Sequence, residues 1–117
     1  MKIYSSWDEA LRANEMSELE IKIENAVRVY EDVLSSSRGR RVAAARTRKK
    51  IKLCGAIQAV DDLVSKPRDR VGFTKLAESG QVEKTFESIV EMHPAEFSAL
   101  AQRQASERLM KFRSTHR

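Results

Sequence analysis

The sequence SELEIKIENAVRVYEDVL, residues 17–34, predicts one long amphipathic helix. Ser17 and Glu20 have the Ser-x-x-Glu spacing in which a hydroxyl and a carboxylate satisfy the free amides at a helix start. Apolar residues then recur at steps of four and three, so they share one face of the helix. We expect this seam either to enter the core of the chain or to pair with a second copy in a homodimer. It comprises Leu19, Ile23, Ala26, Tyr30 and Val33.

Further helices are predicted on both sides of this one. Ser6 and Glu9 repeat the capping spacing near the N-terminus. Residues 1–4 (MKIY) are the only fragment with the character of a strand. The serines at 35–37, followed by Gly39, predict a break in the chain. Helical periodicity then covers about residues 53–65, 73–79, 82–93 and 94–112, with Pro67, Gly80 and Pro94 as end signals.

The length of 117 residues suits a single folding unit. We therefore expect one all-α domain over residues 1–117, a small bundle of about five to six helices. In it, residues 38–52 form a basic helix or arm and residues 113–117 a frayed tail. No apolar run approaches the length of a membrane span, and the lone Cys54 fits a reducing compartment. A cytoplasmic protein that binds no membrane is the expectation.

The stretch RGRRVAAARTRKKIK, residues 38–52, carries eight bases and no acid, whereas the whole chain has 22 bases and 17 acids. Concentrated cations repel one another, so such a block favours a polyanionic partner. If the helix over 53–65 continued back through it, cations would point in every direction around the cylinder. No face of the stretch would then suit a core, and it would have to be solvated or bound. The cations are Arg38, Arg40, Arg41, Arg46, Arg48, Lys49, Lys50 and Lys52.

Duplex nucleic acid is the predicted partner of this stretch. A helix fits the major groove, and no aromatic residue between Tyr30 and Phe73 offers the stacking platform of single-strand binders. The missing platform favours duplex DNA or structured RNA over single strands, and of these two duplex DNA is preferred. Side-chain geometry assigns Arg41 and Arg48 to base reading and the lysines to phosphates. Phosphate contacts could also come from the loop cations Lys66, Arg68 and Arg70.

The segment FTKLAESGQVEKTFESIV, residues 73–90, has the outline of a helix-turn-helix. Its second helix carries Glu83, Glu87 and, just beyond, Glu91 at steps of four, an acidic stripe that DNA would repel. A helical hairpin packed on the core is the preferred interpretation. A turn at Gly55 is a weaker signal, which would set the basic helix against the helix after it.

An enzyme is not expected, because His93, His116 and Cys54 are scattered and no nucleophile has an evident base. No metal-ligand spacing or phosphate-binding glycine loop appears, so neither a metal nor a cofactor is predicted. The sequence favours a nucleic-acid-binding protein that regulates transcription or serves as a DNA accessory protein. The alternative is a helical adaptor whose basic stretch docks on an acidic protein partner.

Overall fold

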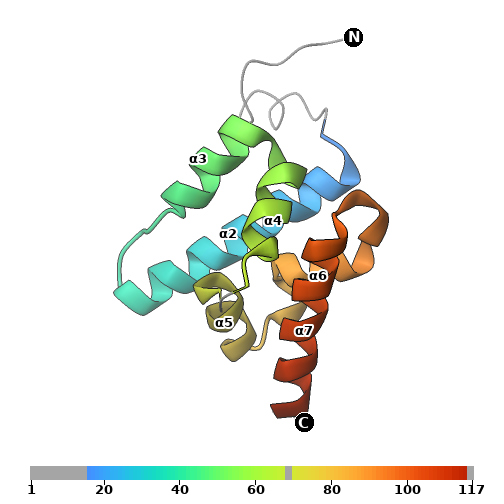
Figure 1. Ribbon diagram of the computed structural model, residues 1–117. Coiled ribbons are helices and arrows are strands. Elements are labelled where there is room, and N and C mark those ends of the chain that lie inside the picture. The colour runs from blue at the N-terminus through green and yellow to red at the C-terminus, as the bar shows by residue number, and fades with distance from the viewer. Residues whose placement is uncertain (1–15, 68–69, 116–117) are drawn as a thin grey trace.

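The computed structural model describes residues 16–67 and 70–115, and this part of the chain is all-α (Figure 1). The prediction of a small all-α bundle is confirmed. Ser6, residues 1–4 and residues 116–117 lie outside the described residues. The elements are α2 (Glu18–Arg38), α3 (Ala45–Cys54), α4 (Ala56–Ser65), α5 (Val71–Glu78), the 3-10 helix η1 (Val82–Lys84), α6 (Phe86–Met92), the 3-10 helix η2 (Pro94–Glu96) and α7 (Ala99–Thr115).

Helix α2 begins as the capping spacing predicts and ends later than expected. The Glu20 amide donates to the Ser17 hydroxyl at 3.2 Å, and the Ser17 amide donates to the Glu20 carboxylate at 3.1 Å. The predicted break lies at Gly39 and not at residues 35–37, because the helix continues through the serines to Arg38. Serine lowers helix propensity only slightly. The helix ends at Gly39, whose φ of 68° lies in the left-handed region that glycine adopts without strain.

The seam of α2 packs largely into the core of its own chain. Leu19, Ile23 and Ala26 are buried there, whereas Tyr30 and Val33 are half-buried. The core partners of the seam include Ala59, Val60 and Val64 of α4 and Val90 of α6. A homodimer through the seam stays a prediction, and in this fold only its C-terminal part is accessible to a second copy.

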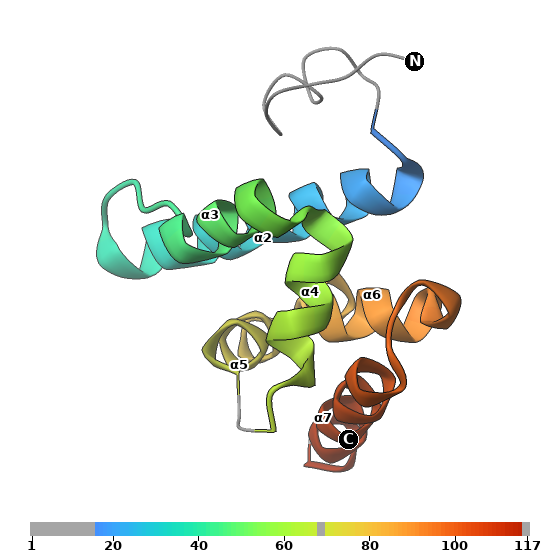
Figure 2. The same ribbon diagram turned by 45° about the horizontal axis from the view of Figure 1, so that its top comes forward.

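A turn at Gly55 separates α3 from α4, so the expected continuous helix over 53–65 is wrong. Gly55 has φ 86° and ψ 158°, a conformation that favours glycine. The turn sends α4 away from the direction of α3, and in both views α3 lies alongside α2 (Figure 1, Figure 2). Leu53 and Cys54, predicted to lie at the core, are therefore exposed.

In the segment with the helix-turn-helix outline, the second helix, α6, is packed into the core. Helix α5 closes at Gly80, where the Gln81 amide donates to the Leu76 carbonyl at 2.9 Å, as predicted for a glycine cap. Five of the seven residues of α6 are buried. Glu87, a member of the predicted acidic stripe, is fully buried. Helix α6 therefore cannot serve as a recognition helix.

Glu87 sits between two arginines and joins four helices. Arg70, at the start of α5, donates from Nε and Nη2 to its two carboxylate oxygens, both at 2.8 Å. Arg108 of α7 donates from Nη1 to Glu87 at 3.2 Å and to the Val64 carbonyl at the end of α4 at 2.7 Å. Arg108 also donates to the Lys66 carbonyl. This cluster ties α4, α5, α6 and α7 together.

We expect Glu87→Gln to lower the free energy of unfolding by about 3 kcal/mol. The substitution keeps the size of the side chain but leaves two guanidinium groups without their buried carboxylate. Urea denaturation followed by circular dichroism measures the effect. Glu83→Gln is the matched control, because Glu83 is exposed on η1 and its change should cost less than about 0.5 kcal/mol. Equal losses in the two variants would contradict this account of the cluster.

Candidate nucleic-acid interface

Helix α3 is fastened to α2 through one arginine and two buried glutamates. Glu24 and Glu31 lie two turns apart on α2, and each is only 2% exposed. Arg48 donates from Nε and Nη2 to the two oxygens of Glu31 at 2.7 and 2.6 Å. Its Nη1 donates to Glu24 at 3.1 Å, and the Ala44 amide donates to Glu31 at 2.9 Å. The basic stretch is thus anchored on the outside of α2.

The same contacts set the charge states of this pair. Hydrogen bonds from Arg48 hold the pKa of the Glu31 carboxyl below its usual 4.5, although burial acts in the opposite direction. Conversely, the Glu31 carboxylate raises the pKa of the Arg48 guanidinium. Both groups are therefore charged at neutral pH.

The prediction that no face of residues 38–52 suits a core is wrong. Ala44 and Ile51 are buried, and Arg48 lies between them on the same face of α3. The guanidinium is tolerated there because two carboxylates neutralise it and accept its hydrogen bonds. The assignment of Arg48 to base reading is corrected accordingly, since its donors are engaged within the protein. The signal in the sequence was the pair Glu24 and Glu31, seven residues apart and close to the apolar seam.

The remaining predicted cations divide into paired and unpaired groups. Arg41 contacts Asp32 at 3.3 Å in an exposed pair, and Lys50 lies 3.6 Å from Asp62. Arg70, predicted to contact phosphate, is held by Glu87 instead. Arg68 lies outside the described residues. Of the predicted cations, those that are exposed and have no carboxylate partner in residues 16–67 and 70–115 are Arg38, Arg40, Arg46, Lys49, Lys52 and Lys66.

A groove of about 720 Å³ brings together four of the predicted cations and one, Lys75, that the sequence did not point to. It is bounded by the C-terminal part of α2, residues 42–47, the end of α4 and the start of α5. Among the described residues that line it there is no carboxylate. Its five cationic side chains are Arg38, Arg46, Lys50, Lys66 and Lys75. Lys75 was not predicted from the sequence because no other cation stands near it in the chain. Lys49 and Lys52, which were predicted, do not line the groove.

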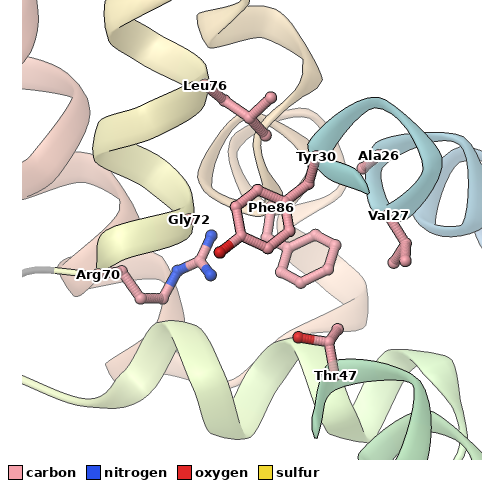
Figure 3. A pocket seen from close by; sticks show the side chains of 8 residues that line it. All are labelled: Ala26, Val27, Tyr30, Thr47, Arg70, Gly72, Leu76 and Phe86. Atoms are coloured by element: carbon pink, nitrogen blue, oxygen red, sulfur yellow. The ribbon is translucent and has the colours of Figure 1, made fainter. Parts of the chain in front are cut away.

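A smaller cavity of about 120 Å³ adjoins this groove, because Tyr30 and Thr47 line both (Figure 3). The rings of Tyr30 and Phe86 and the guanidinium of Arg70 face into it (Figure 3). The Arg70 guanidinium carbon lies 5.1 Å from the centre of the Phe86 ring, a cation–π contact. The cavity is therefore partly aromatic, with polar groups at its wall.

Comparison with known proteins leaves function to be inferred from this geometry, because the chain matches no family model, no curated protein and no solved structure. Within the described ranges, no three His, Cys, Asp or Glu side chains gather as a metal ion would require. None of the described helices combines the length and apolar character needed to cross a membrane.

We expect Arg48→Gln to destabilise the protein by on the order of 2 to 3 kcal/mol at pH 7, because it removes the guanidinium that pairs with the buried Glu31 carboxylate and one of the two arginines that contact Glu24 in the described part of the chain. In the native chain, the Glu31 contribution is present above pH 4.5 and is lost as the pH falls below it, since the folded pKa is the lower one. Arg48→Gln lacks this contribution at every pH, so the difference in stability between the native protein and the variant should become smaller as the pH falls.

Thermal unfolding from pH 7 to pH 3 measures this difference. Arg46→Gln provides the control, because it makes the same charge change on an exposed position of α3. Its stability should follow the native protein at every pH. A deficit of Arg48→Gln that stayed constant from neutral to acid pH would contradict the assigned role of Glu31.

Proposed function

We propose that the protein binds duplex nucleic acid, with DNA favoured, along its basic groove. The observation that carries the proposal is the groove lined by five cations and no carboxylate among the described residues. Cations gathered without counter-charges repel one another, and an extended polyanion neutralises them. Binding also releases the counterions of the polyanion, which favours the complex. The Lys50 ammonium lies 3.6 Å from the partly exposed Asp62 carboxylate. Ion pairs that are accessible to solvent are weak, so Lys50 can still contribute to the phosphate contacts.

The exposed side of α3 is the element that would meet the duplex. Arg46, Lys49 and Leu53 point away from the buried face of this helix, and Leu53 is 74% exposed. Helix α3 lies on the outside of the molecule in both views, beside α2 (Figure 1, Figure 2). Arginine can read guanine in the major groove, and an exposed apolar side chain can contact a thymine methyl group. Arg46 thus takes the role that the sequence assigned to Arg48.

This proposal includes a role in the cytoplasm as a transcription regulator or DNA accessory protein, since binding alone would be the biochemical activity. The second candidate is an adaptor that docks on an acidic protein. The exposed apolar side chains of Leu53 and Val71 favour it, because Val71 lines the basic groove and both could contact a protein surface. The two candidates differ in whether nucleic acid binds at low salt.

We expect the triple variant Arg38→Gln, Arg46→Gln and Lys66→Gln to weaken duplex binding and to flatten its salt dependence. Each lost phosphate contact removes about 0.9 from the slope of log affinity against log salt, so the slope should fall by about three. Fluorescence anisotropy with a labelled DNA duplex across a salt series measures both quantities. All three side chains are exposed, so circular dichroism should show an unchanged fold.

A matched control separates the groove from overall charge. Lys84→Gln, Arg103→Gln and Lys111→Gln remove the same charge from exposed positions outside the groove. This control should retain nearly the native slope. Equal losses in both triple variants would show that binding follows net charge alone and would contradict the groove. No binding to any duplex at low salt would contradict the proposed function and favour the adaptor.

A further inference from the structure

The cavity beside the groove has room for one small ring. Its volume of about 120 Å³ is on the order of the roughly 150 Å³ of a protein cavity that admits benzene. It lies next to the groove through the shared side chains Tyr30 and Thr47. A strand whose phosphates follow the groove cations could therefore place a single base in it.

The wall of the cavity offers hydrogen-bond donors that have no partner in residues 16–67 and 70–115. Arg70 uses Nε and Nη2 for Glu87, and its Nη1 donates to no other residue in the part of the chain that the structure describes. The Tyr30 and Thr47 hydroxyls make no hydrogen bond within the same residues, and both belong to the cavity lining (Figure 3). Three donors around a one-ring space suit a ring that carries carbonyl oxygens.

Gly72 keeps this space open. A Cβ atom at this position would lie 3.1 Å from Arg70 Nη1 and 3.8 Å from the Tyr30 ring. The absence of a side chain therefore lets the guanidinium and the phenol ring line the same cavity. A methyl group would shift the guanidinium by a few tenths of an ångström and would itself take up space on the α5 side of the cavity.

We infer that this cavity binds one unstacked thymine or uracil base of the nucleic acid in the groove. The inference rests on the proposed function. These bases have one ring and two carbonyl acceptors, which match the size of the cavity and its donors. The aromatic and guanidinium walls suit a flat ring. Because unstacking a paired base costs energy, a nucleotide that is already unpaired binds best.

The test uses anisotropy to compare three DNA duplexes that are otherwise identical: one is fully paired, one has a single unpaired thymidine and one has a single unpaired adenosine. We expect the native protein to bind the duplex with the unpaired thymidine about tenfold more tightly than either of the others. This factor corresponds to a gain of one to two net hydrogen bonds. The double variant Tyr30→Phe and Thr47→Val retains the shape of the wall without its hydroxyls. Its preference for thymidine over adenosine should disappear.

Gly72→Ala is a second variant that removes no polar group, and it should also reduce the preference. The groove variant Arg38→Gln, Arg46→Gln and Lys66→Gln should instead weaken all three duplexes by a similar factor and leave the preference intact. Equal binding of the three duplexes by the native protein, or a preference that survives in the double variant, would overturn the base pocket while leaving the groove standing. No binding to any duplex would overturn the proposed function and the base pocket with it.

Discussion

The Arg48 guanidinium held between Glu24 and Glu31 is the interaction on which the arrangement of the basic stretch depends. Glu31 is 2% exposed, and its carboxylate needs a cationic partner, since an unpaired buried charge costs several kcal/mol. Arg48 meets this need only if α3 folds back along α2, and Gly55 supplies the turn that then redirects the chain into α4. The ion pair thereby places Arg46 and Lys50 at the edge of the groove.

A third buried carboxylate, that of Glu87, fixes the opposite wall in the same way. Glu87 holds Arg70 at the start of α5 and Arg108 on α7. These contacts fix the position of α5, and with it Lys75, beside Lys66 at the end of α4. The cavity of Tyr30, Thr47 and Phe86 lies between these two anchors. Buried acids thus divide the basic residues into those that hold the fold and those that remain available to a ligand.

The sequence predicted the fold class and most helix positions, because each rests on local signals. The cap at Ser17, the seam after it and the glycine at 80 act within a few residues of chain. Gly55 was ambiguous because a glycine within a helix costs only about 1 kcal/mol, so periodicity alone favoured a continuous helix. The set of candidate ligand residues was less predictable. Arg48 and Arg46 have the same chemistry and differ only in which carboxylates lie near them.

By itself, the sequence determined an all-α chain with a concentrated block of cations, since composition, capping and period are properties of neighbouring residues. Only the tertiary structure decided which cations are buried and which line a groove. It also created the cavity, by bringing Tyr30, Thr47, Arg70 and Phe86 together from four separate segments. The physical reason is that charge pairing acts through space, so the partner of a buried carboxylate is fixed by how the helices pack and not by its distance along the chain.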